Sequence, residues 1–210
     1  MSPMTPESFQ EETGVSRETL DRLRGYADLL LKWNSQLNLV GESTLEDLWR
    51  RHMFDSAQLV PLLPTPETIR RRVIIDLGSG AGFPGMVLSV LGAGDVHLVE
   101  ANQRKATFLR EVAREVGSDA HIHGVRIDQM RTFAADVVTA RALAPLPELI
   151  GHAAPFLSEG GLGLFLKGEK VNEELTEARK LWKMQTQQFP SRSNPSGTIL
   201  QVGVYQRADA

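Results

Sequence analysis

Apolar residues recur at helical spacing in the first quarter of the chain. Such spacing predicts an amphipathic helix over residues 16–38, and the residues that show it are Leu20, Leu23, Ala27, Leu30, Leu31 and Leu37. A second helix is predicted over residues 43–60, because Ser43 and Glu46 have the spacing of a capping box. Residues 1–15 are polar and acidic, and we expect them to be frayed.

The pattern changes after Pro61, Pro64 and Pro66, which mark a linker. Short apolar runs then alternate with helical stretches, and this alternation predicts a parallel sheet with helices on both faces. The expected strands are 73–77, 96–99, 120–123, 136–139, 163–166, 184–189 and 199–205. The expected helices are the stretch that ends at residue 91, 103–116, 147–157 and 171–183.

The last two strands differ from the others, because only the loop SRSNPSG separates them. A loop of this length has no room for a crossover helix, so the two strands should be antiparallel neighbours. The predicted fold is therefore α/β: a Rossmann-like, seven-stranded, mostly parallel sheet with an antiparallel C-terminal hairpin and an N-terminal helical cap. Residues 1–65 would form the cap and residues 66–210 the sheet domain.

The composition excludes several classes of protein. A chain of 210 residues can bury one sizeable core, and its 41% hydrophobic and 23% charged residues are ordinary for a globular protein. No apolar run is long enough to span a membrane, so we expect no membrane partner. The absence of cysteine excludes disulfides, thiolate metal sites and cysteine nucleophiles. A cytoplasmic location is consistent with these features.

The net charge of −3 gives no sign of a nucleic-acid partner, but the basic residues are clustered. Either the clusters are solvated faces balanced by nearby carboxylates, or they share one face and form a track for RNA. The clusters are Arg50-Arg51-His52, Arg70-Arg71-Arg72, and the set Arg104, Lys105, Arg110 and Arg114.

The sequence IIDLGSGAGFPG at residues 74–85 predicts a ligand-binding turn between a strand and a helix. Gly80, Gly82 and Gly85 satisfy the G-x-G-x-x-G pattern, and Glu100 follows Gly80 by 20 residues. Glycines let the backbone approach a ligand, and the N-terminus of the next helix presents unpaired N–H groups. By itself this pattern does not identify the ligand.

Two features favour S-adenosylmethionine over a nicotinamide cofactor. The strand ends in Asp76, and a carboxylate near the turn would attract an ammonium and a sulfonium but repel a pyrophosphate. The antiparallel C-terminal hairpin is typical of class I methyltransferases rather than dehydrogenases. Glu100 could accept hydrogen bonds from both ribose hydroxyls, although a dehydrogenase could use it in the same way. Gly78, Gly80, Gly82 and Glu100 are the predicted cofactor contacts at this turn.

Five motifs together resemble the GidB family of small-subunit ribosomal RNA methyltransferases, and they follow one another in order over most of the chain. They are DLGSGAGFPG, TARALA at 139–144, FLKG at 165–168, KWN at 32–34 with LNL at 37–39, and Arg51-His52 with Asp55-Ser56. The resemblance implies transfer of a methyl group from S-adenosylmethionine to N7 of a guanine in 16S ribosomal RNA.

The resemblance also implies cofactor contacts at Gly78, Phe83, Ile127, Asp128 and Arg141. Asp128 could accept a hydrogen bond from the adenine amine, or it could be a helix N-cap. Arg141 follows the fourth strand and could pair with the cofactor carboxylate or with an RNA phosphate. Phe83 is expected both to line the pocket and to pack.

Guanine N7 bears an in-plane lone pair and no hydrogen, so attack on the methyl group needs alignment but no general base. We therefore predict no acid–base catalyst and no metal. Methylation of cytosine C5 is excluded, since it requires a cysteine nucleophile. Methylation of an exocyclic amine is disfavoured, because TARALAPL stands where such enzymes usually carry Asn/Asp-Pro-Pro-aromatic.

The candidates for contact with RNA are Asn38, Arg51, His52, Lys167 and Arg192. His52 could instead be a buried histidine with Asp55 as its partner. Arg192 is included because family members often have an arginine just before the final strand, where this chain reads PSGTIL. Trp33 and Trp49 are expected to be core residues that join the cap to the sheet rather than platforms for bases.

The expected partner is 16S ribosomal RNA within an assembled small subunit, because the modest net charge predicts weak binding to naked RNA. A monomer is expected. The alternatives are a methyltransferase of another RNA or a small molecule, a nucleotide-sensing regulator without catalysis, and a nicotinamide oxidoreductase.

Overall fold

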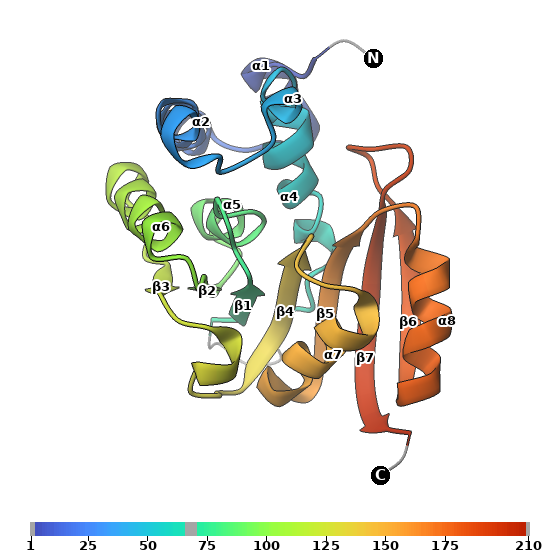
Figure 1. Cartoon of the computed structure of the whole chain (residues 1–210). Helices are drawn as coiled ribbons and strands as arrows, with labels where there is room; N and C mark the ends of the chain where they lie inside the picture. The colour runs from blue at the N-terminus through green and yellow to red at the C-terminus, as the bar shows by residue number, and fades with distance from the viewer. Residues whose placement is uncertain (1–2, 66–70, 209–210) are drawn as a thin grey trace.

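The structure is a computed structural model that describes residues 3–65 and 71–208. Within these residues the chain forms a helical cap over one edge of an α/β sandwich (Figure 1). The linker residue Pro66, the cluster residue Arg70 and the predicted boundary between residues 65 and 66 fall on or beside the segment outside the described residues. The described part contains no helix that is both long enough and apolar enough to cross a membrane.

The cap begins with two helices. The helix α1 covers Pro6–Thr13 and the helix α2 covers Arg17–Leu37. Ser16 caps α2 by accepting a hydrogen bond from the Thr19 amide, so the predicted helix is confirmed to within a residue. The prediction of a frayed N-terminus is wrong, because Phe9 of α1 is fully buried.

The rest of the cap is a chain of short turns where a single helix was predicted. It consists of α3 at Glu42–Leu45, the π-helix η1 at Trp49–Phe54, α4 at Asp55–Ala57 and the 3₁₀ turn η2 at Val60–Leu62. Gly41 occupies the N-cap position of α3, and the predicted capping box from Ser43 to Glu46 does not form. The π-helix gives residues 51–55 a different phase from an α-helix, which changes the directions of their side chains.

The sheet has the predicted seven strands among the described residues, in the spatial order β3-β2-β1-β4-β5-β7-β6. The first five strands are parallel, and β7 is antiparallel to both β5 and β6, which confirms the predicted C-terminal hairpin. The bounds are β1 Val73–Leu77, β2 Asp95–Val99, β3 His121–His123, β4 Ala135–Arg141, β5 Leu157–Lys167, β6 Trp182–Pro190 and β7 Thr198–Arg207.

Helices cover both faces of the sheet. The helices α5 (Gly85–Val90) and α6 (Gln103–Val116) cover one face, and α2 packs outside them (Figure 1). The helices α7 (Leu146–Ala153) and α8 (Val171–Leu181) cover the other face. Two further 3₁₀ turns are η3 at Ile127–Gln129 and η4 at Ala154–Phe156.

A hydrophobic core lies on each face of the sheet. The core on the α5–α6 face continues into the cap, since buried residues of α1 and α2 belong to the same cluster as Ile74 and Val96 of the sheet. Trp33 packs on Phe108 with ring centroids 5.7 Å apart, and Trp49 packs on Phe9 at 5.4 Å. Trp33 therefore joins the cap to the layer on the sheet, as predicted, whereas the contact between Trp49 and Phe9 lies within the cap.

Candidate active site

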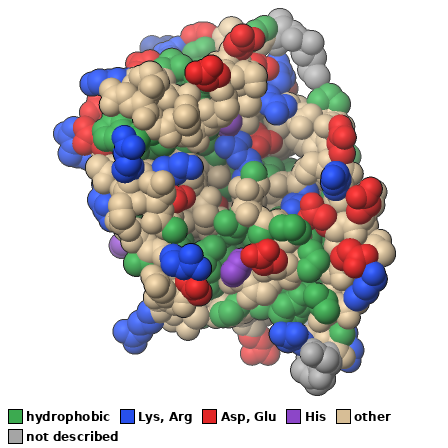
Figure 2. Space-filling view, in the orientation of Figure 1, with side chains coloured by type: hydrophobic (Ala, Val, Ile, Leu, Met, Phe, Trp, Pro, Cys, Tyr) green, Lys and Arg blue, Asp and Glu red, His purple; other side chains and the backbone are tan. Residues whose placement is uncertain are grey.

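A cavity of about 970 Å³ lies where the strands end and the cap covers them. It is lined by the turn after β1, by residues that follow β2, β3, β4 and β5, by cap residues 39–55 and by the loop between β6 and β7. The space-filling view shows this face hollowed beneath the cap, with charged side chains of both signs around the hollow (Figure 2). Open α/β sheets bind their ligands at this edge.

The cap packs against the glycine turn. Gly78 and Gly80 line the cavity, whereas Gly82 does not and faces inward toward α2. A Cβ atom on Gly82 would lie 2.5 Å from the hydroxyl oxygen of Tyr26, and the φ of +99° also disfavours a side chain. The buried Tyr26 hydroxyl donates a hydrogen bond to the carbonyl of Ala81. Gly82 is thus a packing residue, and its predicted cofactor contact is not seen in this geometry.

Asp76 does not line the cavity, so its carboxylate could act on a cationic cofactor only from beneath the turn, and the predicted attraction remains a prediction. The residue is fully buried beneath the turn. Its carboxylate accepts hydrogen bonds from Thr139 Oγ1 at 2.8 Å and from the Gly85 amide at 3.2 Å. Burial raises the pKa of Asp76 from its ordinary 3.8 to about 6. The carboxylate therefore fixes the turn to the start of α5 and to β4.

Glu100 follows β2 and lines the cavity, as the ribose-binding prediction requires. Its carboxylate also accepts hydrogen bonds from the Gly80 amide at 2.8 Å and the Asn102 amide at 2.7 Å. A carboxylate has about four lone-pair positions, so capacity remains for a ligand's hydroxyl groups. The two amides fix the direction in which the carboxylate points.

Ile127 and Asp128 follow β3 and also line the cavity. Asp128 is not a helix N-cap, because it lies within η3, whose N-cap residue is Arg126. Its carboxylate forms a bidentate ion pair with Arg126, with both N–O distances 3.0 Å. The predicted hydrogen bond from an adenine amine to Asp128 remains a prediction.

Arg141, at the end of β4, connects the sheet to the cap. Its Nη1 donates to the Arg51 carbonyl at 3.0 Å and to Asp55 Oδ2 at 3.2 Å, and its Nη2 donates to His52 Nδ1 at 3.0 Å. The guanidinium also lies over the ring of Phe83, 5.0 Å from its centroid. The sequence left open a cofactor or an RNA partner for Arg141, and it did not indicate this set of contacts within the protein.

His52 is buried, with 5% of its surface exposed, but Asp55 is not its partner. Since an arginine can only donate, His52 Nδ1 accepts from Arg141 and the ring proton lies on Nε2. Nε2 is 2.7 Å from Thr44 Oγ1. The threonine hydroxyl accepts a hydrogen bond from this N–H group and donates one to the Gly41 carbonyl. Burial and the nearby cations Arg141 and Arg51 lower the pKa of His52 to about 3. The imidazole is therefore neutral, and its one lone pair is already used.

Phe83 lines the cavity and lies between two rings, so its predicted double role is confirmed. Its centroid is 5.3 Å from that of Tyr26 and 4.9 Å from that of His52, and both pairs are stacked. The stack extends from α2 through the glycine turn to η1.

Lys167 lies at the end of β5 and lines the cavity, but its charge is paired. Its Nζ is 2.5 Å from Glu174 Oε2 and donates to the Ala144 carbonyl at 3.1 Å, and only 9% of its side chain is exposed. Glu174 also accepts from the Leu146 amide. Contact between Lys167 and RNA remains a prediction.

The loop between β6 and β7 contributes residues that sequence reasoning missed, among them Ser191, Ser193 and Asn194. Ser193 donates to Asp55 Oδ1, which ties this loop to the cap. A signal for the loop existed. Because β6 runs parallel to the first five strands, its carboxyl end lies at the same edge of the sheet as theirs.

Two of the predicted RNA contacts lie away from the cavity lining. Asn38 is exposed and is the C-cap residue of α2, with a φ of +45°. Arg192 pairs with Glu12 at 2.7 Å, and its guanidinium lies over the ring of Phe54. Neither side chain lines the cavity, so a direct contact with a base held there is not supported by this geometry.

The basic clusters do not share one face. Arg71 and Arg72 precede β1 at the amino edge of the sheet, and both donate to nearby backbone carbonyls. Arg51 and Lys105 are different, since they line the cavity at the carboxyl edge. They are also the two lining cations with no ion-pair partner within residues 3–65 and 71–208, as Arg126, Arg141 and Lys167 are all paired.

The chain matches a family model described as GidB, rRNA small subunit methyltransferase G, over residues 19–198. It is 53% identical to the ribosomal RNA small subunit methyltransferase G of Rhodospirillum rubrum, with 98% of this chain and 100% of the relative covered. It is 52% identical to the protein of the same name from Paramagnetospirillum magneticum, with 99% of each chain covered.

Among solved structures, the fold is similar to that of a magnesium protoporphyrin IX methyltransferase from Synechocystis PCC 6803 with bound SAM. The TM-score is 0.59 at 14% identity, with 91% of this chain and 98% of that chain covered. A second similar structure is a mutant of MtNAS in complex with S-adenosylmethionine, with a TM-score of 0.57 at 15% identity and coverage of 97% and 85%. These likenesses confirm the class I methyltransferase fold.

Proposed function

The chain belongs to the GidB family, rRNA small subunit methyltransferase G, and from this we propose that it transfers a methyl group from S-adenosylmethionine to N7 of a guanine in 16S ribosomal RNA. The observation that carries the proposal is one cavity with two differently built halves beside the junction of β1 and β4. The order of the strands reverses there, and open sheets bind nucleotides at such a point.

The half next to β1, β2 and β3 suits S-adenosylmethionine. Gly78 and Gly80 leave room for the methionine end, and the oriented carboxylate of Glu100 suits the ribose hydroxyls. The apolar side chain of Ile127 beside Asp128 suits the face and the amine of adenine. When bound, the cofactor supplies an electrophilic methyl group on a sulfonium.

The half next to β4, β5 and the cap suits the target guanine. It is formed by Arg51, His52, Arg141, Lys167 and the β6–β7 loop, and most of these groups are fixed by contacts with one another. A site held rigid in this way can align a ring nitrogen with the methyl carbon without reorganisation. Serine and asparagine side chains of the loop offer hydrogen bonds to the polar edge of a base.

The state of His52 supports a mechanism without a general base. Its single lone pair accepts a hydrogen bond from Arg141, and its pKa is lowered to about 3. An imidazole so engaged is a poor proton acceptor at neutral pH, but it can hold Arg141 and Phe83 in place. Guanine N7 has no proton to lose, so the reaction needs none removed. The role of His52 is therefore positioning.

We further propose that the substrate is the assembled small subunit, that the enzyme acts as a monomer and that it works in the cytoplasm, where this RNA is found. Among the residues that the structure describes, Arg51 and Lys105 are the cations at the cavity without an ion-pair partner, and the net charge is −3. Few phosphate contacts predict weak binding to naked RNA, so the assembled subunit would have to supply a preformed shape.

The proposal is tested by incubating the protein with methyl-labelled S-adenosylmethionine and small subunits that lack the modification. We expect the label on one guanine N7 of 16S RNA, where methylation makes the chain cleavable after reduction and aniline treatment. Deproteinised RNA should accept much less label than the subunit. Matched reactions contain Glu100→Gln, which removes a cofactor contact.

Four outcomes would contradict parts of the proposal. Label on an exocyclic amine would overturn N7 as the nucleophile, and label on another RNA or a small molecule would overturn the substrate. Equal labelling of naked RNA and subunits would overturn the preference for the assembled particle. Protection of the protein from proteolysis by a nicotinamide dinucleotide, but not by S-adenosylmethionine, would overturn the cofactor.

A further inference from the structure

Three histidines and an aspartate gather on one side of the β2–β3 edge of the sheet. His97 of β2 is paired in register with His121 of β3, and Val99 is paired with His123. Asp95 precedes His97 by two residues, so both side chains point to the same face of the strand. None of the four residues lines the cavity of the candidate active site.

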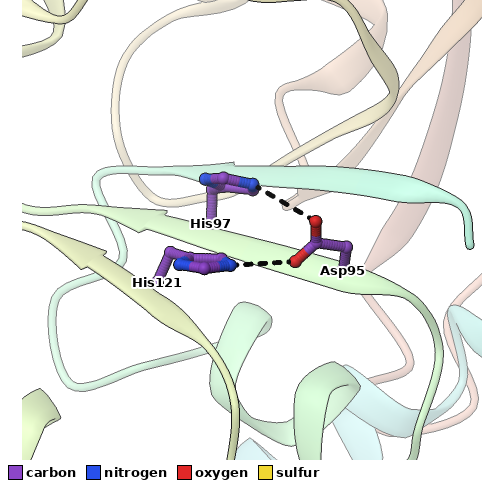
Figure 3. Close-up of side chains that lie close together, drawn as sticks. All are labelled: Asp95, His97 and His121. Atoms are coloured by element: carbon purple, nitrogen blue, oxygen red, sulfur yellow. Dashed lines mark ion pairs between the residues drawn. The ribbon is translucent and has the colours of Figure 1, made fainter.

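The rings of His97 and His121 both face the carboxylate of Asp95, each toward a different oxygen (Figure 3). His121 Nε2 is 3.2 Å from Asp95 Oδ1, and His97 Nε2 is 3.8 Å from Asp95 Oδ2. The three potential ligand atoms all lie within 4.8 Å of one another. Two atoms bound to one zinc ion at roughly 2.1 Å can be no more than about 4.2 Å apart, so small rotations of the side chains would suffice.

A neighbouring residue holds His97 in the orientation that a metal ligand needs. Its Nδ1 is 2.9 Å from His123 Nε2. In one of its two tautomers His97 donates Nδ1–H to His123, and metal-binding histidines commonly donate their other ring N–H to such a partner. In the tautomer that donates from Nδ1, the lone pair of His97 Nε2 faces a carboxylate oxygen of Asp95 with no proton between them. A cation would relieve this opposition.

The imidazole stack limits how far the rings can move. The rings of His97 and His121 are stacked with centroids 4.6 Å apart, and Phe133 packs against His97 at 4.5 Å. The site is nevertheless open to solvent, with exposed side-chain fractions of 18% for His97, 38% for Asp95 and 55% for His121. An ion could therefore enter from water and keep water in its remaining positions.

We propose that Asp95, His97 and His121 form a binding site for a divalent transition-metal ion of the zinc type. Imidazole nitrogens select zinc, cobalt, nickel or copper over magnesium and calcium, which prefer sites made of oxygen. The role is structural, since the site is separate from the cavity. The ion would join the three-residue strand β3 to β2, and β3 leads into the turn with Ile127 and Asp128 that lines the cavity.

The test uses the untagged full-length protein, freed of metal by a chelator and titrated with Co²⁺ and then Zn²⁺. We expect one equivalent of Co²⁺ to bind with visible absorption bands and Zn²⁺ to displace it. His97→Ala and His121→Ala should each weaken Co²⁺ binding at least tenfold, and Asp95→Asn should weaken it less. His152→Ala is the matched control, because His152 also pairs with a carboxylate, that of Glu148 at 3.4 Å, on another element.

A second measurement on the unmodified protein guards against variants that fail to fold. In NMR spectra, Co²⁺ should shift or broaden the ring signals of His97, His121 and His123 while those of His52 stay sharp. Absence of binding at equimolar Co²⁺, signals broadened elsewhere in the chain, or a His97→Ala variant that is folded and binds Co²⁺ as tightly as the parent would each overturn the proposal.

Discussion

Arg141 Nη1 and Asp55 Oδ2 lie 3.2 Å apart, although the two residues are 86 positions apart in the chain. Asp55 also accepts hydrogen bonds from Ser193 and from Gln58 Nε2. One carboxylate of the cap thus binds the end of β4 and the β6–β7 loop. These two segments form the side of the cavity that we assign to the target base.

Removal of this carboxylate should destabilise the protein and disorder the base-binding side. Asp55→Ala leaves Arg141 and Ser193 without a shared acceptor, and only 15% of the Asp55 side chain and 20% of the Arg141 side chain are exposed. We expect a loss of about 2 kcal/mol, or roughly 4–8 °C in Tm, together with a large loss of methyl transfer. Thermal unfolding and the labelling assay measure the two effects.

Asp21→Ala is the control for that variant. Asp21 pairs with Arg24 on the surface, where its side chain is 59% exposed, so the change should be within about 0.5 kcal/mol of the parent. If both aspartate variants unfolded at the same temperature as the parent, the contacts of Asp55 would not contribute to stability.

Tyr26→Phe should weaken both stability and cofactor binding. The variant keeps the ring stack with Phe83 but leaves the buried carbonyl of Ala81 without its donor. The expected cost is about 1–3 kcal/mol of unfolding free energy. Since Ala81 lines the cavity, the dissociation constant of S-adenosylmethionine should rise as well. Urea denaturation would measure the unfolding free energy, and calorimetry would measure the dissociation constant. If neither changed, the Tyr26 hydroxyl would contribute to neither stability nor cofactor binding.

Glu100→Gln and Arg51→Ala should separate the two halves of the cavity. The first variant removes the charge of the carboxylate that the Gly80 and Asn102 amides orient, and it should weaken S-adenosylmethionine binding roughly tenfold, about 1.4 kcal/mol. The second should leave cofactor affinity intact and weaken binding to the small subunit. Calorimetry with the cofactor and filter binding with the subunit distinguish them. A loss of cofactor affinity in Arg51→Ala would contradict the division.

The salt dependence of subunit binding provides a further check on Arg51. If its guanidinium neutralises one phosphate, the slope of log K against log salt should fall by about 0.7–1 in Arg51→Ala. Arg114→Ala is the control, because Arg114 lies on α6, pairs with Glu111 and does not line the cavity. Identical slopes for all three proteins would mean that Arg51 contacts no phosphate.

The buried carboxyl of Asp76 should make stability depend on pH. Its pKa is about 6 in the folded protein and 3.8 ordinarily, so protonation favours folding. The contribution is fully present below about pH 4 and is lost as pH rises through 6, which amounts to about 3 kcal/mol. Relative to Asp76→Asn, the parent should lose about this much stability between pH 4 and 7. If urea denaturation showed that the unfolding free energies of the parent and of Asp76→Asn change with pH in the same way, the raised pKa of Asp76 would be contradicted.

The alternation of apolar runs was enough to predict the sheet, because strand and helix periods are local properties of the sequence. The helix α6 begins and ends where its pattern does, at Gln103 and Val116. The cap was harder, since a π-helix and 3₁₀ turns interrupt the apolar spacing that a single helix would show. Nothing local indicates that Phe9 packs against Trp49 and orders the N-terminus.

The candidate site was predicted in its location but not in its contacts. Glycines and the residues after each strand identify the edge where a ligand binds, and Glu100 and Phe83 lie there as expected. Whether a side chain faces the ligand or the interior depends on packing, as Asp76 and Gly82 show. The contacts of Arg141 with the cap join residues far apart in the sequence, and no periodicity reports them.

The hydrogen bond from Tyr26 to Ala81 means that the methyltransferase sheet cannot be moved to another protein without its cap and keep the same glycine turn. A chimera that took this chain only from β1 onward would lack Tyr26. The Ala81 carbonyl would then lose its hydrogen-bond donor, and the face of Phe83 that stacks on Tyr26 would be exposed to water. Any chimera built on this scaffold must bring its own aromatic hydroxyl to that place. The cap and the sheet therefore fold as one unit around the glycine turn.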